Sequence, residues 1–525
     1  MHTKTGTGLF RRFLQIGIYH EFHSKWTKLA TRQRELALSV TALNMRSSLK
    51  TLLATSTFWT LGRGQSSTAQ CSTTISASYA APSLAEGYVA RIVASNLTSP
   101  RGIKFDNQGA LLVIQEGVGI SVHNIVDAGN DCLSVSNSKV IVEDDSLNHG
   151  IELSEDGNTL YASNAESLYS WDYSVQNQAT TSDSRTLVDG MNGTDHSSRT
   201  LLLSRQVPGM MVINRGSFEN IDERALNIST GVSQIKAFNL SNITDTPYDY
   251  PTEGLRLGWG LRNDVGIAEH PSTGGIWSVE NSADQLERSG DDIHEDNPAE
   301  KLNFLGYLNG TMTEEQGRNF GYPECFSAWD PEALPDFDGT VGEQFAIGDL
   351  SATNNDSLCA DRQTPRLSFQ AHMAPLDIVF NKAGSAAWIS FHGSWNRDSP
   401  VGYKLSVVEF ADGEPTENSS STVAAKDIMS NQDLSACPSG CFRPVGLAWD
   451  QQGRLFMSSD STGEIYVITR NDGNATNAVG TNVTIPGSTG SGTQSASPSQ
   501  SSSAAGFLSE PSILGALFSA FALLL

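Results

Sequence analysis

The sequence predicts an all-β protein, and in particular a six-bladed β-propeller. A short apolar run, a turn containing Asp, Asn or Gly, and a second apolar run recur six times along the middle of the chain. Apolar runs joined by such turns are typical of β-hairpins. Charged residues make up only 18% of the 525 residues, and the sequence shows no long amphipathic helix. This composition argues against a coiled coil and against an ordinary helical enzyme.

The six repeats set the architecture. They cover 102–114, 151–163, a looser copy at 200–214, 265–279, 376–390 and 445–458. Each copy has about 65–70 residues available, which is more than four bare strands need, so insertions are expected. Hairpins repeated at this scale indicate radial β architecture, because closing the ring protects the sheet edges. A large β-sandwich, or two of them, is the alternative.

The first 69 residues look like a leader and not part of the fold. Met45 opens a pattern with the basic residues Arg46 and Lys50, an apolar stretch over 52–61, and small residues at Ser67 and Ala69. This is the pattern of a secretory signal peptide over 45–69, with translation beginning at Met45. A signal anchor or a mitochondrial presequence formed by residues 1–44 is the alternative. The propeller is expected to occupy 70–472.

The C-terminal end also differs from the middle. Residues 473–506 are rich in Ser, Thr, Gly and Asn, which predicts a linker. Residues 507–525 end in an apolar tail that is too short to span a bilayer. Small residues, a spacer and such a tail resemble a GPI-attachment signal. A hydrophobic tail that docks loosely on the protein is the alternative.

Cysteines and sequons agree with a secreted protein. The six cysteines form no C-x-x-C pair, so zinc and thioredoxin-like chemistry are not expected. Six cysteines in a secreted chain indicate three disulfides, and neighbours in sequence would pair as 71–132, 325–359 and 437–441. Ten N-x-S/T sequons predict glycosylated surface loops; they lie at Asn96, Asn192, Asn227, Asn239, Asn242, Asn309, Asn355, Asn418, Asn474 and Asn482.

The charge balance excludes one class of partner. The chain has 34 Lys and Arg against 58 Asp and Glu, a net charge of −24. So acidic a surface repels phosphate backbones, and nucleic-acid binding is not expected. Contact with a membrane is expected only through the GPI anchor.

Polar residues that could take part in catalysis or binding cluster where the predicted blades meet their loops. A propeller places its site on such loops at one end of the channel. Each segment alone also has a structural interpretation, because a lone loop histidine or an acidic loop is often only structural. These segments are Asn148-His149-Gly150, Gly260-Leu261-Arg262-Asn263, Glu280-Asn281-Ser282-Ala283-Asp284, Gly290-Asp291-Asp292, Glu300-Lys301-Leu302-Asn303, His372-Met373-Ala374-Pro375, Phe391-His392-Gly393-Ser394-Trp395-Asn396-Arg397 and Arg443-Pro444-Val445.

Taken together in this order, the segments resemble the soluble glucose/sorbosone dehydrogenase family, and most closely the fungal secreted pyranose dehydrogenases. The resemblance spans about 90–470, and the segments 391–397 and 260–263 are its most specific parts. It implies a six-bladed propeller that binds pyrroloquinoline quinone (PQQ) and Ca²⁺. It also implies oxidation of a pyranose or a 2-keto sugar at the C1 hydroxyl to a lactone.

The resemblance also implies roles for individual residues. His149 matches the catalytic base, and Arg262 matches the cation beside the quinone carbonyl. PQQ carries three carboxylates, so cationic and donor groups suit it. The implied cofactor-binding residues are Arg262, Asn263, His372, His392, Arg397 and Arg443, with Gln115 as a weaker match. Ca²⁺ prefers oxygen ligands; the implied metal ligands are Ser282 and Ala283, with Asp291, Asp292 and Glu300 either serving calcium or only ordering their loop.

The sequence departs from the family at two points. Ser282-Ala283 stands where bacterial members have Gly-Pro, and His392 or Arg397 stands near a lysine of those enzymes. No cytochrome domain is evident in this chain, so electrons would pass to an acceptor outside it. The candidate acceptors are an external cytochrome domain, a copper oxygenase and a quinone. Two other functions remain open, a Ca²⁺-dependent lactonase using His149 and a non-catalytic propeller that binds glycans or protein.

Overall fold

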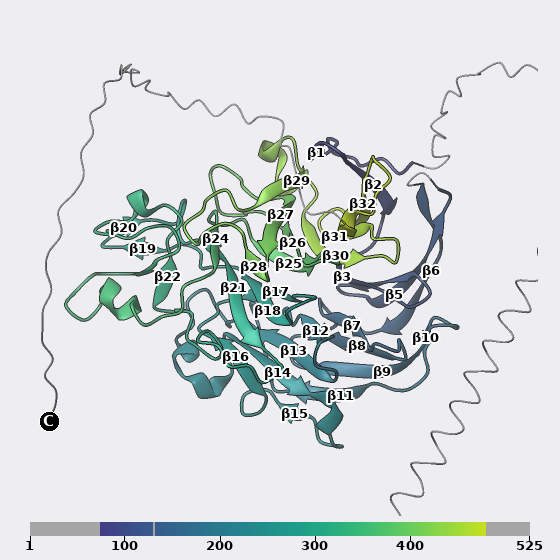
Figure 1. The fold of residues 1–525 in the computed structure, drawn as a ribbon, viewed down its shortest axis with the longest axis horizontal. Helices are drawn as coiled ribbons and strands as arrows, with labels where there is room; N and C mark the ends of the chain where they lie inside the picture. The colour runs from purple at the N-terminus through teal and green to yellow at the C-terminus, as the bar shows by residue number, and fades with distance from the viewer. Residues whose placement is uncertain (1–73, 130–131, 479–525) are drawn as a thin grey trace, which may run out of the picture. The chain divides into compact units, whose positions relative to one another are not determined.

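Six β-sheets are arranged around a common axis, each beginning near the centre and extending outward strand by strand (Figure 1). The computed structural model describes residues 74–129 and 132–478. Within these ranges the regular elements are β-strands and 3-10 helices of three or four residues, without an α-helix. The predicted six-bladed β-propeller is therefore confirmed.

The blades are numbered along the chain, and their strands are given from the centre outward. The first three are blade 1, β3 (Pro100–Phe105), β4 (Ala110–Gln115), β5 (Gly119–Asp127) and β6 (Leu133–Glu143); blade 2, β7 (Ile151–Leu153), β8 (Thr159–Ser163), β9 (Leu168–Ser174) and β11 (Arg185–Asp189); and blade 3, β12 (Leu201–Leu203), β13 (Met210–Arg215), β14 (Gln234–Asn239) and β16 (Leu255–Trp259).

The other three are blade 4, β17 (Asp264–Glu269), β18 (Gly275–Glu280), β21 (Glu300–Tyr307) and β24 (Leu367–Phe369); blade 5, β25 (Pro375–Phe380), β26 (Ala386–Phe391), β27 (Lys404–Ala411) and β29 (Lys426–Ser430); and blade 6, β30 (Pro444–Trp449), β31 (Leu455–Ser459), β32 (Glu464–Arg470) and β2 (Tyr88–Ala94).

Short elements complete these sheets and their loops. The short strands are β1 (Ser83–Leu84) on blade 5, β10 (Ala179–Thr180) and β15 (Tyr248–Asp249) on blade 2, and β28 (Glu414–Pro415) beside β27. The 3-10 helices are η1 (Glu223–Leu226), η2 (Ile228–Thr230), η3 (Leu240–Asn242), η4 (Pro331–Ala333), η5 (Asp356–Cys359), η6 (Leu434–Ala436) and η7 (Thr476–Ala478).

The first strands of the blades form a closed ring, in which β3 contacts both β7 and β30. Glycines allow this close approach. A Cβ atom at Gly102 would lie 1.9 Å from the His149 carbonyl oxygen, and one at Gly446 would lie 2.3 Å from the Arg101 carbonyl oxygen. The ring is completed by β2, which pairs antiparallel with β32 and so joins the two ends of the domain in blade 6.

The hydrophobic core lies between neighbouring blades. Trp277 of blade 4 packs in one cluster with Phe380 and Phe410 of blade 5, and Trp388 of blade 5 packs with Met457 and Tyr466 of blade 6. The two tryptophans are fully buried. Burial of large apolar side chains is the main stabilising contribution to such a fold. The six predicted hairpins correspond to the two innermost strands of each blade.

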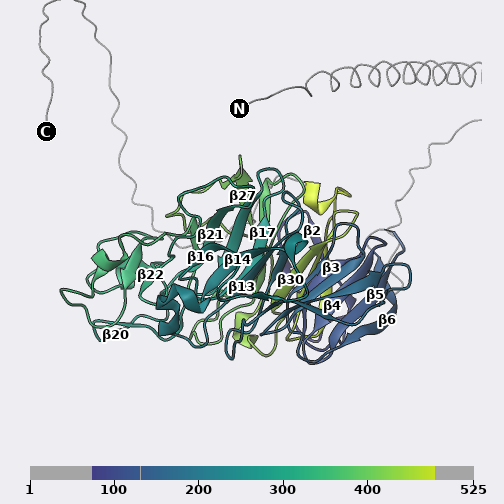
Figure 2. The ribbon, with the colours of Figure 1, turned by 90° about the horizontal axis from the view of Figure 1, so that it is seen from below.

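Blade 4 carries the insertions that the repeat length predicts. They include two small hairpins, β19 (Glu287–Arg288) with β20 (Asp291–Asp292) and β22 (Cys325–Ser327) with β23 (Gln344–Ala346), which lie to one side of the ring (Figure 2). The predicted disulfides Cys325–Cys359 and Cys437–Cys441 are both formed. The predicted 71–132 pairing involves Cys71, which lies outside the described residues, as do the predicted leader, the tail and 479–506 of the predicted linker.

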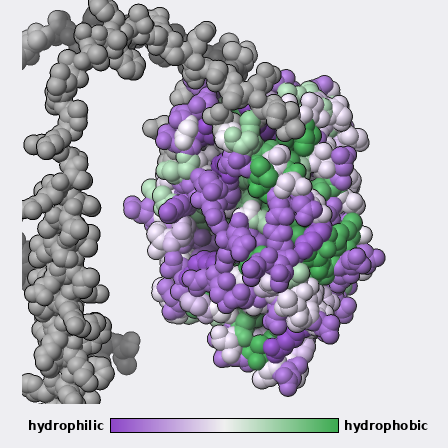
Figure 3. All heavy atoms as spheres, turned by 90° about the vertical axis from the view of Figure 1, so that its right-hand side faces the viewer, coloured by the Kyte–Doolittle hydropathy of each residue, from purple (hydrophilic) through white to green (hydrophobic). Residues whose placement is uncertain are grey.

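One side of the propeller is mainly polar. The side shown in Figure 3, where β5 and β6 lie, is mostly hydrophilic, with small separate hydrophobic areas. In the described part of the chain, no helix has the length and apolar character needed to cross a membrane.

Candidate active site

The predicted site residues come from equivalent places in different blades. In each blade, the start of the first strand and the end of the second lie at the same edge, because the two strands are antiparallel. His149, Arg262, His372 and Arg443 precede first strands, whereas Ser282 and His392 follow second strands. The ring therefore brings them to one end of the propeller.

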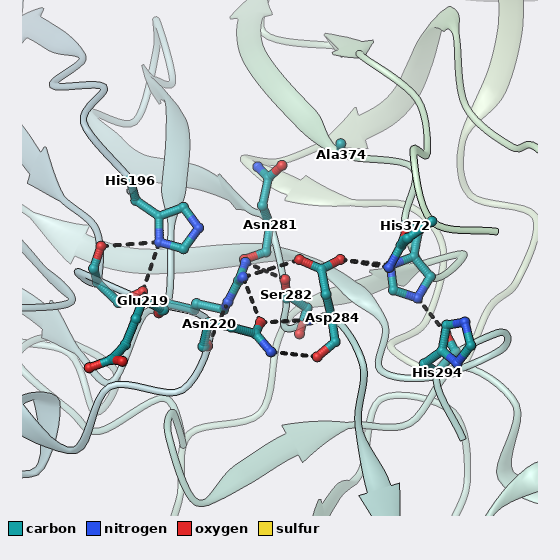
Figure 4. A network of polar contacts seen from close by, with 12 residues as sticks. His196, Glu219, Asn220, Asn281, Ser282, Asp284, His294, His372 and Ala374 are labelled. Atoms are coloured by element: carbon teal, nitrogen blue, oxygen red, sulfur yellow. Dashed lines mark hydrogen bonds and ion pairs between the residues drawn. The ribbon is translucent and has the colours of Figure 1, made fainter. Parts of the chain in front are cut away.

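The first group of contacts at this end centres on Asp284. Its Oδ2 lies 3.3 Å from Arg262 Nη2, and its Oδ1 lies 3.3 Å from His372 Nδ1. Figure 4 shows the Asp284 carboxylate directed toward His372. We call Arg262, Asp284 and His372 the Asp284 group. A carboxylate between two cationic side chains holds both in place by charge-assisted hydrogen bonds.

Arg262 is almost fully enclosed by acceptors. Only 4% of its side chain is exposed, and its guanidinium donates to the carbonyl oxygen and side-chain oxygen of Asn220 at 3.1 and 2.8 Å, and to the carbonyl oxygen of Ser282. Asn220 in turn donates to the Asp284 carbonyl at 2.6 Å (Figure 4). The orientation of Arg262 is therefore fixed before any ligand binds.

The contacts in this group shift its pKa values. Burial alone would raise the pKa of Asp284, but the hydrogen bond with His372 and the charge of Arg262 lower it below its usual range. Burial alone would lower the pKa of His372, but the hydrogen bond with Asp284 and the charge of Glu300 raise it. The group thus favours an ionised carboxylate beside a protonated histidine.

A second group has the same composition. Asp460 Oδ2 lies 2.9 Å from Arg101 Nη1, and Asp460 Oδ1 lies 2.8 Å from His392 Nε2. We call Arg101, His392 and Asp460 the Asp460 group. Burial alone would raise the pKa of Asp460, but its interaction with His392 and the charges of Arg101 and Arg443 lower it to about 2. Burial lowers the pKa of His392 even though Asp460 opposes this effect.

Arg443 lies beside the Asp460 group. It donates to the carbonyl oxygens of His392 and Gly393 at 3.1 and 2.9 Å, and its guanidinium lies over the Tyr403 ring, 5.6 Å from the centroid. These contacts attach the start of blade 6 to the loop that follows β26 in blade 5.

His149 is a buried histidine whose pKa is affected by the charges of the Asp460 group. Its residue is 3% exposed, and its Nδ1 atom is buried without a hydrogen-bond partner. Burial lowers its pKa to about 3, and the charge of Arg101 contributes to this shift while Asp460 opposes it. A neutral imidazole with a nitrogen free of partners can accept a proton.

The remaining predicted cofactor residues, Asn263 and Arg397, are half-buried, and each has one buried polar atom. The Asn263 Oδ1 atom has no hydrogen-bond partner, and neither does Arg397 Nη1. Arg397 Nη2 lies 3.4 Å from Asp296 and 3.5 Å from Glu295. Gln115 differs from these residues because both ends of its amide are used within blade 1, where it donates to Ser121 at 2.7 Å and accepts from the Thr98 amide at 2.8 Å.

The predicted metal ligands fall in two places. Ser282 and Ala283 lie beside the Asp284 group, where the Ser282 carbonyl accepts from Arg262 and the Ser282 amide donates to Glu300 at 2.7 Å. Burial raises the pKa of Glu300 to about 7. Asp291 and Asp292 are exposed on β20, and Asp292 accepts from His294 Nδ1 at 2.6 Å. Among the described residues, no three His, Cys, Asp or Glu side chains form a set that could hold a metal.

Sequence reasoning did not single out four residues of the site. Arg101 lies at the start of β3, as Arg443 directly precedes β30, and Asp460 follows β31 just as His392 follows β26. This equivalence between blades is the signal that would have identified both. Asn220 lies in a loop that has no equivalent position in another blade, so no such signal points to it. His196 Nδ1 forms a hydrogen bond of 2.8 Å with Ser217 Oγ (Figure 4). Burial together with the charge of Arg262 lowers the pKa of His196 to about 3.

A separate cavity occupies the central channel. It has a volume of about 510 Å³, and its walls are the first strands of the blades with their following turns, including Lys104, Glu152, Arg205 and Lys382. His149 borders this cavity, whereas Arg262, His372 and Arg443 do not. The turns that follow the first strands lie at the opposite end of the ring from Arg262, His372 and Arg443, so this cavity is distinct from the arginine-containing groups.

Comparisons with known proteins identify relatives of this chain. A PQQ-dependent sugar dehydrogenase from Hypocrea jecorina is 46% identical over 418 residues, which cover 78% of this chain and 95% of the relative. A PQQ-dependent pyranose dehydrogenase from Coprinopsis cinerea is 38% identical over 408 residues, 74% of this chain and 55% of the relative. This chain therefore matches about half the length of the second relative.

Solved structures give the same result. The calcium structure of the Trichoderma reesei carbohydrate-active enzyme of family AA12 superposes with a TM-score of 0.74 at 45% identity, covering 76% of this chain and all of that one. The holo form of the pyranose dehydrogenase PQQ domain from Coprinopsis cinerea superposes with a TM-score of 0.71 at 36% identity, covering 76% of this chain and 99% of that one. The family model described as TrAA12-like matches residues 82–471, nearly the whole propeller, and this chain is a member of that family.

Proposed function

We propose that this protein is a secreted oxidoreductase that uses PQQ and Ca²⁺ to oxidise pyranoses or 2-keto sugars. The C1 hydroxyl would become a lactone, and the electrons would pass to an external acceptor. The names of the relatives in Hypocrea jecorina and Coprinopsis cinerea support PQQ as the cofactor and a sugar as the substrate. The lactonase and the non-catalytic binding module have no comparable support.

The observation that carries this proposal is the presence of two similar groups, the Asp284 group and the Asp460 group, at the same end of the propeller. They bring Arg262 and Arg101, together with Arg443, to one end of a propeller whose chain has a net charge of −24. Planar guanidinium groups suit carboxylates because they donate two parallel hydrogen bonds. A small molecule with three carboxylates, such as PQQ, fits this set of residues better than a neutral ligand does.

Buried polar atoms without partners provide a second test of the fit. They include Asn263 Oδ1, Ser282 Oγ, Asn396 Oδ1 and Arg397 Nη1. An unpaired buried polar atom costs free energy, so such atoms tend to mark places where a ligand or water completes the hydrogen bonds. We propose that Arg262, Asn263, His372, His392, Arg397 and Arg443 hold the cofactor.

PQQ, when bound, would supply an electrophilic quinone carbon as the hydride acceptor for the oxidation at C1. His149 takes the proton of the C1 hydroxyl at its free ring nitrogen. A pKa of about 3 makes His149 a weak base, and part of that depression comes from the positive charge of Arg101. An anion bound beside Arg101 would offset this charge and raise the basicity of His149 toward the useful range. Arg262 is the cation placed to stabilise negative charge on the ligand.

Binding of Ca²⁺ is a separate part of the proposal. Ca²⁺ is coordinated by six to eight oxygen atoms, and the backbone carbonyls of Ser282 and Ala283 would supply two of them. The Ser282 carbonyl is already an acceptor for Arg262, and the exposed Asp291 and Asp292 contact His294 and not this place. The protein ligands are therefore too few for tight binding of calcium alone, and the site would need further oxygen ligands.

Titration of the full-length protein with PQQ tests the function. We expect saturable binding, seen as a change in the cofactor absorbance, that is tighter with Ca²⁺ than with a chelator. Sugar-dependent reduction of a dye should follow. Arg443→Met should weaken PQQ binding at least tenfold, whereas the exposed Arg185→Met should not change it. Absence of saturable PQQ binding by the wild type would sink the proposal.

A second experiment tests the role of His149. His149→Asn should retain PQQ binding and lose most of the turnover, because no group would accept the hydroxyl proton. His123→Asn is a matched control, since His123 is another buried histidine, bonded to serines within blade 1. Turnover that survives in His149→Asn would remove this residue from the mechanism.

Secretion and anchoring are proposed from the sequence ends and the sequons. Of the ten sequon asparagines, the nine in the described residues lie at exposed or half-buried positions, which suits glycosylation. We propose cleavage after Ala69 and a GPI anchor in place of the tail. Mass spectrometry of the mature protein, with and without phospholipase treatment of cells, tests both. A mature protein that keeps the apolar tail 507–525 would contradict the anchor.

A further inference from the structure

Trp395 is exposed in a way that no other aromatic residue of the described chain is. Its relative exposure is 66%, whereas every other Phe, Tyr and Trp in residues 74–129 and 132–478 is buried or half-buried. An exposed indole offers a large, flat and rigid apolar face that a ligand can cover, with an N–H group at its edge. Trp395 lies in the segment 391–397, where every other residue is buried or half-buried.

The segment around Trp395 is held firmly on both sides. Before it, the Ser394 carbonyl accepts from the Tyr403 hydroxyl, and the Ser394 hydroxyl accepts from the Val401 amide at 3.1 Å. After it, Asn396 donates to Asp284 Oδ1 at 3.0 Å. Because its neighbours are fixed in this way, Trp395 is presented to solvent on an ordered support.

This segment also connects the two arginine-containing groups of the site. His392 belongs to the Asp460 group, and Asn396 contacts Asp284. Arg443 holds the intervening backbone through the carbonyls of His392 and Gly393. Trp395 therefore lies within a loop whose two ends contact the candidate cofactor-binding residues, and so at the rim of the candidate site.

We propose that Trp395 binds the face of a second sugar ring, next to the one whose hydroxyl is oxidised, so that the enzyme accepts oligosaccharides at their reducing ends. The inference rests on the proposed function and adds the substrate class. A pyranose has an apolar face of C–H groups, and the negative face of an indole attracts their partial positive charge. The sugar at His149 would be enclosed, because His149 is only 3% exposed, whereas a ring on Trp395 remains partly in water.

The surroundings favour a sugar over a protein as the occupant. Trp395 is flanked by polar side chains, with Asn396 and Arg397 half-buried and Asp398 exposed. A protein interface needs a larger surface, typically about 800 Å² on each partner with several apolar anchors. One aromatic ring among polar groups matches the size of one sugar residue and offers hydrogen-bond partners for its hydroxyls.

Two variants of the full-length protein test the inference by steady-state kinetics. With PQQ, Ca²⁺ and a dye acceptor, Trp395→Ala should lower kcat/KM for cellobiose and maltose about tenfold, mainly through KM. The value for glucose should change less than twofold, and Trp395→Phe should keep most of the disaccharide activity. Met312→Ala, at another exposed apolar side chain (78%), is the matched control.

A binding measurement without cofactor separates this inference from the proposed function. Cellobiose should quench or shift the tryptophan fluorescence of the wild type, and Trp395→Phe should lose that change. If the wild type oxidises no sugar but the fluorescence change depends on Trp395, the proposed function fails and the sugar subsite stands. The subsite would be overturned if Trp395→Ala lowered kcat/KM equally for glucose and the disaccharides, or for neither. It would also be overturned if kcat/KM fell only when a protein acceptor replaced the dye.

Discussion

Asp460 and Arg101 form an ion pair of 2.9 Å across the junction where the last blade meets the first. Asp460 follows β31 in blade 6, whereas Arg101 lies in β3 of blade 1. The side chains are 13% and 14% exposed, so water screens the pair only in part. The same carboxylate holds His392 of blade 5. A single side chain thus connects three blades at the candidate site.

Asp460→Asn should destabilise the apo protein by about 2 kcal/mol, because two cationic partners lose a charged acceptor. Urea unfolding of the variant and the wild type measures this loss. Asp472→Asn is the control, since its pair with Arg470 lies at the surface and should contribute little. Asp460→Asn should also lower the pKa of His392 further, because Asp460 opposes the effect of burial. Equal stability of the two variants, or an unchanged His392 pKa by NMR, would contradict this role.

Lys301 and Glu280 form a fully buried ion pair in blade 4. The two atoms Lys301 Nζ and Glu280 Oε2 are 2.9 Å apart, and each side chain is 1% exposed. Lys301→Met should cost about 3–5 kcal/mol of unfolding free energy, because it leaves a buried carboxylate without its partner. Adding Glu280→Gln should recover part of the loss, as the unpaired charge disappears.

The half-exposed pair of Lys426 and Glu409 provides the control for that experiment. Lys426→Met should cost at most about 1 kcal/mol. If Lys301→Met cost no more than Lys426→Met in chemical unfolding, the buried pair would not stabilise the blade as expected.

Asp377 should make stability depend on pH. Burial raises its pKa from 3.8 to about 7, although the amides of Leu447 and Ile378 donate to it. Between about pH 4 and 7 the folded protein therefore binds a proton that the unfolded chain has lost. The stabilisation is complete below pH 4 and is lost as the pH rises through 7, with a steepest slope of about 1.4 kcal/mol per pH unit.

Asp377→Asn should flatten this part of the stability profile, measured as unfolding free energy at several pH values. The exposed Asp183→Asn should leave it unchanged. A profile that is equally steep with Asn at position 377 would show that other groups cause the dependence.

The Cys325–Cys359 disulfide should stabilise the insertion of blade 4. It closes a loop with a sequence separation of 34 residues, and loop closure of this size contributes about 2–4 kcal/mol. Replacing both cysteines with Ala should lower the thermal midpoint and expose the β22–β23 hairpin to protease. The shorter Cys437–Cys441 loop, with a separation of 4, should matter less when both of its cysteines are replaced. The reverse order of effects would argue against the loop-closure explanation.

The sequence predicted those parts of the fold that depend on local patterns. Each hairpin of innermost strands is marked by apolar runs and a turn, as in β25 and β26, and all six match the structure. The closing strand β2 was not predicted, because its partner β32 lies at the other end of the domain. No local pattern records a pairing over such a distance.

The candidate site shows the same limit. His149, Arg262 and Arg443 could be named because their segments resemble a family, and the structure places them at one end of the ring. Arg101 and Asp460 look like ordinary surface charges in the sequence, and they become a half-buried pair only when blades 1 and 6 meet. Asp291 and Asp292 look like a metal-binding pair in the sequence, but β20 exposes them on an insertion. Burial of this kind depends on the closed ring and is not encoded in a short segment.

The pairing of β2 with β32 has a consequence for biosynthesis. Because blade 6 combines strands from both ends of the domain, the ring cannot close until the chain has been made as far as Arg470. Until then, blades 1 to 5 have an open edge, and this state is the most prone to aggregation. Maturation of this enzyme is therefore expected to finish only after translation of the whole domain, and no product that ends before β32 should fold.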